Sequence, residues 1–303
     1  MAKKIQSFAR EITSPQLLEY VATLSFPTHW VPNFGPEILT LIAQSYANVD
    51  EFVFVQMGPS MQVATQLLAS GKKIWILNME QMTRAEHKQP TADAVPFDFE
   101  NWIFGFLRFP NVGVMDYSWD NIQIWKKLLP KVAPKTSPQI KWLPFLPALP
   151  ELLRQPPLPE ADSVLKPVVF VGDASSAHRS SILFKLEDVV HTLTGVFGED
   201  RDVQLQQFPI LLNVHFGQSY GVLEEIRVLP AVLRKQIVVS ETSLFDKQHP
   251  LAKFIIFAPY ERLDACVRNA IRHKEKLYAK LYDNNPHWDS LLDDIKQFAQ
   301  RQK

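Results

Sequence analysis

The sequence predicts an α/β protein made of two halves, each with its own mostly parallel sheet. Short apolar stretches of strand composition alternate with helical patterns along both halves, at a spacing that favours βαβ units over a sandwich. The chain has 303 residues, about twice the usual size of a domain. A proline-rich stretch near the middle separates the halves, so two domains are expected.

Strands alternate with helices in the first half. Apolar stretches predict four strands, at 51–57, 72–80, 111–118 and 141–147. A helical pattern at 60–70 begins just after Pro59 and stops at Gly71, and a second one lies at 119–129. This order predicts a parallel sheet for the first half.

Residues 145–167 have the highest proline density of the chain. Proline fixes φ and removes a backbone donor, so this stretch is expected to be an extended linker rather than a helix or a central strand. We therefore place the domain boundary at 148–166, with an N-terminal domain over 1–150 and a C-terminal domain over 151–303.

The second half repeats the order of the first. Strands are expected at 168–173, 210–216, 236–241 and 254–260, and helices at 180–194, from Leu223 and from Glu261. A last helix over 288–300 carries apolar residues at helical spacing, so one face of it must dock. Its docking partner, either its own half or the N-terminal domain, stays open.

Composition excludes several classes of function. The chain has 32 basic and 32 acidic residues, so no long-range field attracts nucleic acid or an anionic membrane. Cys266 is the only cysteine, which excludes a disulfide framework and a cysteine-based metal cage. The N-terminus lacks an apolar stretch of signal length, and no stretch reaches about 18 apolar residues. We therefore expect a cytoplasmic protein without a transmembrane segment.

Glycine and proline usage limits the choice of cofactor. The chain has 10 glycines and 23 prolines, and it contains neither a G-x-G-x-x-G motif nor a P-loop. A cofactor held by a glycine-rich loop is therefore not expected, and we predict that the protein needs none.

Polar residues cluster where the strands of the second half end. Ligands of open α/β sheets bind beyond the carboxyl ends of the strands, because loops and helix N-termini converge there. Arg179, near the start of a helix, is suited to bind a diphosphate, and Glu224, at the start of another, can accept both hydroxyls of a ribose. For Glu224 and Glu225, complementing the helix dipole is an equal alternative. These residues predict a site for a nucleotide and a sugar. The predicted residues of this site, called the donor-binding residues below, are Gly172, Ser176, Arg179, Asn213, His215, Tyr220, Glu224, Arg227, Glu241 and Tyr260.

The second half resembles GT-B glycosyltransferases of the group-1-like branch, which is found in bacterial, viral and polysaccharide-synthesis proteins. The resemblance lies in "VVFVGD…HRSSILFKL", "ILLNVHF…LEEIRVLPAVLRKQIVVSE" and "FIIFAPYERLDACVRNAI". In the first half, "KKIWILNMEQM" and "VGVMDYSWDNIQIW" resemble the matching N-terminal segments. The resemblance covers residues 50–275, and its C-terminal motifs are the more specific.

The resemblance implies two Rossmann-like domains that face each other across a cleft. It also implies transfer of a sugar from a nucleotide-sugar donor on the C-terminal domain to a glycan or other acceptor on the N-terminal domain. Glu224 matches the glutamate that usually holds the ribose, Arg179 is placed to bind the diphosphate, and Gly172 permits close approach at the strand end. Tyr260 is expected near the nucleobase of the donor, and a position in the hydrophobic core is the equal alternative.

One position departs from the family pattern. Retaining members of the superfamily commonly carry two glutamates eight positions apart, whereas Phe216 stands eight positions before Glu224 and is followed by Gly217. The sequence therefore favours inversion at the anomeric carbon, which requires a general base. The N-terminal half offers Glu80, which we favour as the base, and the further candidates Asp116, His29 and Glu37. For each of these residues a structural role is an equal alternative.

The motif "DRD" at 200–202 is formally a D-x-D of the kind that holds Mn²⁺ in other glycosyltransferases. It precedes the strand at 210–216, at the end opposite the ligand edge, in a stretch that we interpret as a solvated turn. The histidines lack the spacing of zinc ligands. We therefore predict no metal site.

Two further classes of function stay open. One is a non-catalytic nucleotide- or glycan-binding module with the same fold, because a fold does not prove activity. The other is a nucleotide-sugar epimerase or another dinucleotide enzyme, against which the missing glycine fingerprint counts. The leading interpretation is a metal-independent, inverting glycosyltransferase that uses a UDP- or GDP-sugar.

Overall fold

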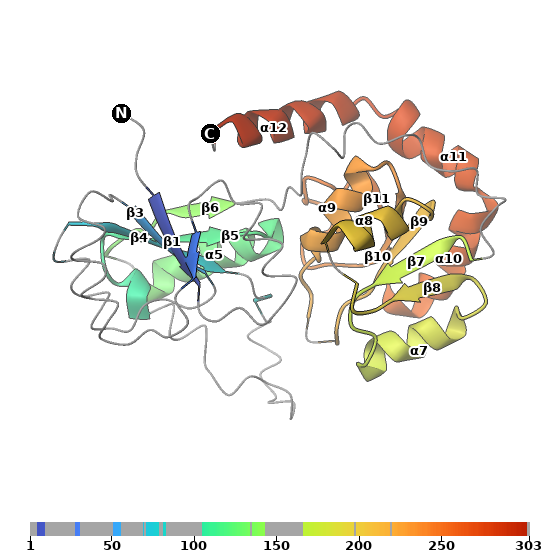
Figure 1. Ribbon diagram of the computed structural model, residues 1–303, viewed down its shortest axis with the longest axis horizontal. Coiled ribbons are helices and arrows are strands. Elements are labelled where there is room, and N and C mark those ends of the chain that lie inside the picture. Colours follow the sequence, from blue (N-terminus) through green and yellow to red (C-terminus); the bar gives the residue numbers. More distant parts are fainter. Residues whose placement is uncertain are drawn as a thin grey trace. The chain divides into compact units, whose positions relative to one another are not determined.

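The computed structural model of the chain is shown in Figure 1. It describes residues 5–9, 28–30, 51–55, 69, 71–78, 81–82, 105–133, 135–142, 166–196, 198–218 and 220–301. The chain divides into two compact units, Met1–Pro144 and Phe145–Lys303. Apart from Lys166, the linker expected at 148–166 lies outside the described residues. The domain limits 1–150 and 151–303 therefore stay predictions.

The first unit contains a six-stranded parallel sheet with the order β2-β1-β3-β4-β5-β6. Its strands are β1 Ile5–Ala9, β2 Thr28–Trp30, β3 Glu51–Val55, β4 Lys73–Asn78, β5 Val112–Asp116 and β6 Ile140–Trp142. The last four correspond to the four strands expected from the sequence, whereas β1 and β2 were not expected. The helix predicted at 60–70 lies, apart from Ala69, outside the described residues.

Helix α5, Trp119–Val132, follows β5 as expected. It begins at Ser118, whose hydroxyl accepts a hydrogen bond from the backbone N–H of Asn121 and so satisfies one of the free donors of the first turn. Trp125, on this helix, is fully buried. The local sequence therefore supplies both the start of the helix and the side chain that anchors it.

The second unit contains a five-stranded parallel sheet with the order β11-β10-β9-β7-β8. Its strands are β7 Val168–Val171, β8 Val190–Leu193, β9 Ile210–Asn213, β10 Ile237–Glu241 and β11 Ile255–Ala258. The chain runs from β7 to β8 on one side and then returns to β9 on the other. The gap between β7 and β9 is therefore the switch point, where open α/β sheets bind their ligands.

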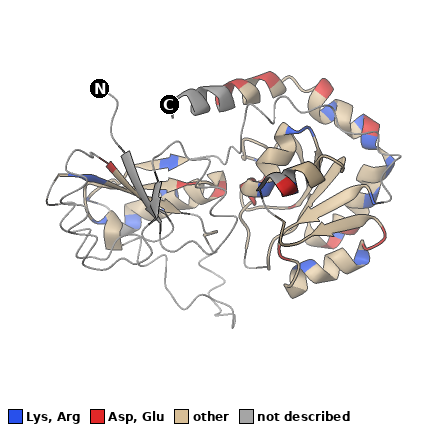
Figure 2. Cartoon of the chain, viewed as in Figure 1, with Lys and Arg blue, Asp and Glu red and all other residues tan. Residues whose placement is uncertain are grey.

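The helices of the second unit lie between and after its strands (Figure 1). They are α7 Ala177–Lys185, α8 Gly198–Leu205, α9 Glu225–Leu233, the short turn η3 Tyr260–Arg262, α10 Leu263–Arg272, α11 Lys274–Tyr278, η4 Ala279–Asp283 and α12 Trp288–Arg301. Basic and acidic residues are interspersed along α10 and α11 (Figure 2). The predicted fold class, two α/β units with parallel sheets, is confirmed.

Two local predictions in the second unit were wrong. The helix expected at 180–194 is the shorter α7 followed by β8, because the β-branched stretch that begins at Val189 pairs with β7 rather than extending the helix. The "DRD" stretch is not a turn but part of α8. In both places the neighbouring strands, rather than local composition, decide the outcome.

The last helix begins against its own unit. Trp288, the first residue of α12, contacts the rings of Phe254 and Tyr282 edge-on, at centroid distances of 5.6 and 5.3 Å. Tyr282 in turn donates a hydrogen bond to the backbone carbonyl oxygen of Gln236, ahead of β10. These contacts attach the start of α12 to the second core, and a contact of this helix with the N-terminal domain stays a prediction.

Candidate functional site

Two arginines meet at the carboxyl edge of the second sheet. Arg179, in the first turn of α7, donates from Nε to the Val214 carbonyl oxygen at 3.0 Å and from Nη1 to the Asp173 carbonyl oxygen at 2.9 Å. Arg227, on α9, donates from Nη1 to the carbonyl oxygen of Val171, the last residue of β7, at 2.8 Å. Both guanidinium groups are thus tied to the chain where β7 and β9 end, at the switch point.

Gly172 lies between the two arginines. Its φ is +131°, a conformation that side-chain-bearing residues rarely adopt. A Cβ at this position would lie 2.9 Å from Nη1 of Arg227 and 3.9 Å from Nη1 of Arg179. The predicted close approach at Gly172 is therefore used by the two guanidinium groups, which lie beside its backbone.

The pair is electrostatically suited to an anion. Arg179 is only 4% exposed, and burial, followed by repulsion from Arg227, lowers its pKa to about 10. The group still carries its full charge at neutral pH. The two neighbouring cations repel each other, and Glu224, which pairs with Arg227, offsets part of this repulsion. A diphosphate has the negative charge to offset the rest.

The start of α7 adds to the positive potential at this edge. The hydroxyl of Ser176 caps the helix by accepting from the backbone N–H of Arg179 at 3.2 Å. The first turn of α7 contains no acidic residue, so its free N–H groups and its dipole keep their positive character. Ser176 is therefore a capping residue that positions Arg179.

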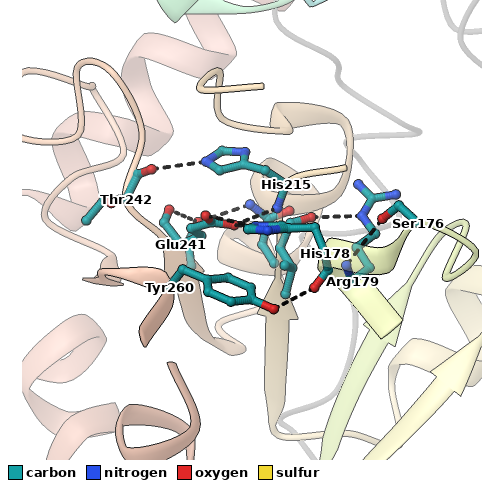
Figure 3. A network of polar contacts seen from close by, with 10 residues as sticks. Ser176, His178, Arg179, His215, Glu241, Thr242 and Tyr260 are labelled. Carbon is teal, nitrogen blue, oxygen red and sulfur yellow. Dashed lines mark hydrogen bonds and ion pairs between the residues drawn. The ribbon is translucent and has the colours of Figure 1, made fainter. Parts of the chain in front are cut away.

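Glu241, the last residue of β10, gathers a polar network beside the arginines (Figure 3). His178 donates from Nε2 to the carboxylate at 3.0 and 3.1 Å, and the backbone N–H of His215 donates to it at 3.0 Å. The ring of Tyr260 stacks on His178 with centroids 4.0 Å apart, and its hydroxyl donates to the His178 carbonyl oxygen at 2.7 Å. The network joins α7, the loop after β9, the end of β10 and η3.

The three glutamates of the edge have different partners. Glu224, just before α9, accepts from Arg227 at 3.0 Å. Glu225 is fully buried and accepts from Nε2 of His249 at 3.1 Å, while Nδ1 of that histidine accepts from the backbone N–H of Leu251. Glu224 therefore belongs to the arginine site, and Glu225 joins α9 to the loop before β11.

The remaining predicted donor-binding residues lie in β9 and in the loop that follows it. Asn213 ends β9 and donates from Nδ2 to the hydroxyl of Ser240 at 3.0 Å. Tyr220 donates its backbone N–H to the Gly217 carbonyl oxygen and contacts the ring of Phe216 edge-on. Phe216 also lies under the guanidinium of Arg179, at 5.2 Å.

Sequence reasoning assigned no role to His178. The structure makes it the partner of both Glu241 and Tyr260. Its place next to Arg179, in the first turn of the same helix, is the signal that points to it. Its pairing with a carboxylate 63 positions away is not visible in the sequence.

The candidate bases lie in the first unit. Asp116 is fully buried at the end of β5, and its two oxygens accept hydrogen bonds from Asn78, Asn121, Trp125 and the backbone of Ser118. Burial is the main cause that raises its pKa to about 7. Glu80 and Glu37 lie outside the described residues, as does the side chain of His29, a residue of β2.

The described residues contain no group of three or more His, Cys, Asp or Glu side chains arranged to hold a metal ion. Asp200 in α8 is exposed, and the side chain of Asp202 is outside the described set. None of the helices in the described part of the chain combines the length and apolarity that a bilayer crossing requires.

Comparisons with known sequences find only uncharacterized relatives. No family model matches the chain. It is 24% identical over 267 residues to the uncharacterized protein L137 of Acanthamoeba polyphaga mimivirus, which covers 84% of this chain and 33% of that protein. A second mimivirus protein, R358, is 28% identical over 109 residues, 34% of this chain and 39% of that protein. The chain thus spans about a third of the length of these relatives.

Comparisons with solved structures identify the fold. Sucrose-phosphate synthase from Thermosynechococcus elongatus superposes with a TM-score of 0.54 at 11% identity, covering 99% of both chains. T4 phage BGT, in complex with UDP and Mn²⁺, gives 0.52 at 11% identity over 98% of this chain and 97% of that one. A UDP-N-acetylglucosamine 2-epimerase gives 0.50 at 10% identity over 94% and 92%. The chain has the GT-B fold, as the sequence resemblance implied.

Proposed function

We propose that the chain is a glycosyltransferase that moves a sugar from a UDP- or GDP-sugar to a hydroxyl group of a glycan or another acceptor. The observation that carries the proposal is the convergence of Arg179 and Arg227 on Gly172 at the switch point of the second sheet. The site is shaped for a diphosphate, which is the part that all such donors share. The GT-B fold supports this assignment.

The arginines act on the leaving group. During transfer, the acceptor oxygen forms a bond to the anomeric carbon while the bond from that carbon to the diphosphate oxygen breaks, and the electron pair of this bond stays on the phosphate. Arg179 and Arg227 stabilise the negative charge that develops there, and the N-terminus of α7 adds to their effect. The proton of the acceptor hydroxyl passes to a general base.

Glu80 remains the preferred base in this proposal. It follows β4 by two residues, and β4 and β5 end in register at Asn78 and Asp116. Ligands of such sheets bind at the carboxyl edge, where β4 and β5 end. Asp116 is the weaker candidate, because four hydrogen bonds from its own unit already occupy its buried carboxylate.

The proposed reaction needs no metal, because the two arginines neutralise the diphosphate. We expect transfer or donor hydrolysis to continue in excess EDTA, and a variant with both Asp200→Ala and Asp202→Ala to stay active. T4 phage BGT was solved with Mn²⁺, so a requirement for a metal is the alternative that this test decides. Loss of activity in EDTA that Mn²⁺ restores would contradict the metal-independent proposal.

A thermal-shift screen of the purified chain with UDP, GDP, CMP and dTDP tests the donor class. A ligand that binds only the folded state raises the melting temperature, and the most effective nucleotide names the donor. Arg179→Gln and Arg227→Gln should each abolish the shift. A shift without release of the nucleotide from any UDP- or GDP-sugar would favour the non-catalytic binding module.

The similarity to a UDP-N-acetylglucosamine 2-epimerase makes an epimerase the second candidate function. The missing glycine fingerprint, which counts against dinucleotide enzymes, does not test an epimerase that has the GT-B fold. Incubation with UDP-N-acetylglucosamine, followed by NMR of the sugar, distinguishes the two. Inversion at C2 without transfer to an acceptor would replace our proposal with the epimerase.

A further inference from the structure

One histidine at the ligand edge has a buried ring nitrogen whose role the arginine site leaves open. His215 follows β9 and is 2% exposed. Its Nε2–H donates to the Thr242 carbonyl oxygen at 3.0 Å, and its backbone N–H donates to Glu241 at 3.0 Å (Figure 3). The residue is held at the ring and at the backbone, so its orientation is fixed.

The contact with Thr242 decides the tautomer of His215. A carbonyl oxygen only accepts, so the ring proton is on Nε2 and Nδ1 carries a lone pair. Burial lowers the pKa of His215, against a smaller opposing effect of the Glu241 carboxylate, so the ring is neutral at pH 7. Nδ1 is shielded from solvent and accepts no hydrogen bond from any residue that the structure describes.

A second acceptor of the same kind lies two positions earlier, at the end of β9. Asn213 donates from Nδ2 to Oγ of Ser240, which gives its only proton to the Glu241 carbonyl oxygen at 2.8 Å. The amide must therefore turn Nδ2, not Oδ1, toward the serine. Its Oδ1 is buried and, within the described part of the chain, has no donor. Two buried acceptors near one strand end favour a ligand that donates to them.

His215 belongs to the neighbourhood of the arginine site. The charges of Glu224 and Arg227 are both close enough to affect its pKa. The residue before it, Val214, supplies the carbonyl oxygen to which Arg179 donates. His215 is therefore one residue away from the backbone group that holds Arg179.

We propose that Nδ1 of His215 accepts a hydrogen bond from a neutral O–H or N–H group in the nucleoside or sugar part of the ligand. This inference rests on the proposed function. A diphosphate oxygen cannot fill this position, because at neutral pH it accepts and does not donate, whereas ribose, hexose and nucleobase groups donate. The arginines therefore bind the anion, and His215 selects what is attached to it.

Two substitutions of His215 separate this role from a structural one. In His215→Gln, the amide nitrogen lies near the original Nε2 and can still donate to Thr242, but the Nδ1 acceptor is lost. In His215→Asn, the amide oxygen lies near the original Nδ1, so the acceptor is kept and the Thr242 contact is lost. Isothermal titration calorimetry with inorganic pyrophosphate, UDP, GDP, UDP-glucose and GDP-mannose measures both variants against the unmodified chain.

We expect His215→Gln to weaken binding of the preferred nucleotide or nucleotide sugar about tenfold, as for the loss of one hydrogen bond. Its affinity for pyrophosphate should not change, and His215→Asn should keep most of the nucleotide affinity. A weaker nucleotide sugar with unchanged UDP and GDP would place the donor group on the sugar.

Three results would overturn the inference. Equal affinity of His215→Gln and the unmodified chain for the nucleotides and for the nucleotide sugars would mean that Nδ1 does not contact the ligand. An equal loss for pyrophosphate and nucleotide, or a larger loss in His215→Asn than in His215→Gln, would assign the histidine a structural role. Failure of the unmodified chain to bind any of these nucleotides would instead refute the proposed function, and the inference with it.

Discussion

At the scale of single residues, Gly172 shows how the chain makes room for charge. A positive φ and the absence of a side chain allow Nη1 of Arg227 to lie beside the backbone and to donate to the carbonyl oxygen of Val171. Any other residue would push the end of the arginine away, because a Cβ would lie 2.9 Å from that nitrogen. Gly172 is therefore needed both by the backbone and by the site.

We predict that Gly172→Ala weakens nucleotide binding. Displacement of Arg227 removes a charge-assisted hydrogen bond to the diphosphate. This loss costs about 1.5–3 kcal/mol, or roughly ten- to hundred-fold in the affinity for the preferred nucleoside diphosphate. Titration calorimetry measures the loss. Gly195→Ala is the matched control, because its φ of +69° strains an alanine while the space around its Cβ is open. The control should lose about 1 kcal/mol of stability without losing affinity; an equal affinity loss in both would contradict this account.

Asp116 is the residue whose ionisation should affect the stability of the first unit. Burial raises its pKa from 3.8 to about 7 in the folded state. Between about pH 4 and pH 7, Asp116 keeps its proton in the folded chain, whereas the unfolded chain has released it. The free energy of unfolding should therefore fall as the pH rises through this range. The pH dependence of the urea midpoint measures the effect.

The Asp116→Asn variant is the test of that assignment. It removes the titrating group, so its stability should not show this decline, although it should be less stable overall by about 1–3 kcal/mol because its Nδ2 meets donors instead of accepting from them. His215 acts in the opposite sense, since burial lowers its pKa and its contribution is lost as the pH falls below about 6.5. Parallel profiles for the variant and the unmodified chain would remove Asp116 as the cause.

At the scale of elements, α9 begins with two glutamates that have different tasks. Glu224 lies before the helix and pairs with Arg227 one turn later. Glu225, the first helical residue, is turned into the unit and pairs with His249. Neighbouring residues on a helix point in directions about 100° apart, so one can belong to the site while the next belongs to the core.

The two glutamates should therefore separate in a mutational test. Glu225→Ala should lower the free energy of unfolding by about 1.5–3 kcal/mol, because it leaves a buried histidine without its carboxylate. Glu224→Ala should leave stability almost unchanged and weaken nucleotide binding roughly ten- to hundred-fold. Urea unfolding and titration calorimetry measure the two effects.

The same Glu224 variant distinguishes two ways in which the residue can act. If Glu224 binds the ribose, its loss should weaken UDP or GDP but not inorganic pyrophosphate. If it only orients Arg227, both ligands should weaken together. Unchanged affinity for all three would place the ribose elsewhere.

At the scale of the whole molecule, both units repeat one topology. In each sheet the first strand of the chain order lies between the second and the third, as in β2-β1-β3 and β8-β7-β9. Each sheet therefore has a switch point at its carboxyl edge. The second edge carries the arginine site, and the first edge is where we place the base and the acceptor.

The stereochemistry of the transfer follows from a glutamate that the second unit lacks. With no glutamate eight positions before Glu224, we expect the product to have the anomeric configuration opposite to that of the donor, which NMR of the anomeric proton determines. Glu80→Gln should abolish transfer and keep nucleotide affinity, because we propose that the nucleotide binds to the second unit. Asp116→Asn is the control, because Asp116 is the second candidate for the general base. Retention of configuration would refute the inverting mechanism and the need for a base.

The sequence by itself determined the two α/β units and the polar residues at the carboxyl edge of the second sheet. Strand periodicity is a local property, and so is the position of polar residues such as Gly172, Arg179 and Glu224 after a strand or at the start of a helix. Strand β8 escaped prediction because its short β-branched stretch follows a helix directly, and only pairing with β7 makes it a strand.

Only the tertiary structure decided which of these residues meet. The pairing of His178 with Glu241, the burial of Glu225 against His249 and the four hydrogen bonds to Asp116 join residues that are far apart in the chain or on different elements. Composition and spacing carry no signal for such contacts, because strand order and packing set the distances. The tautomer of His215, and with it the lone pair on Nδ1, likewise depends on one carbonyl oxygen supplied by the end of a neighbouring strand.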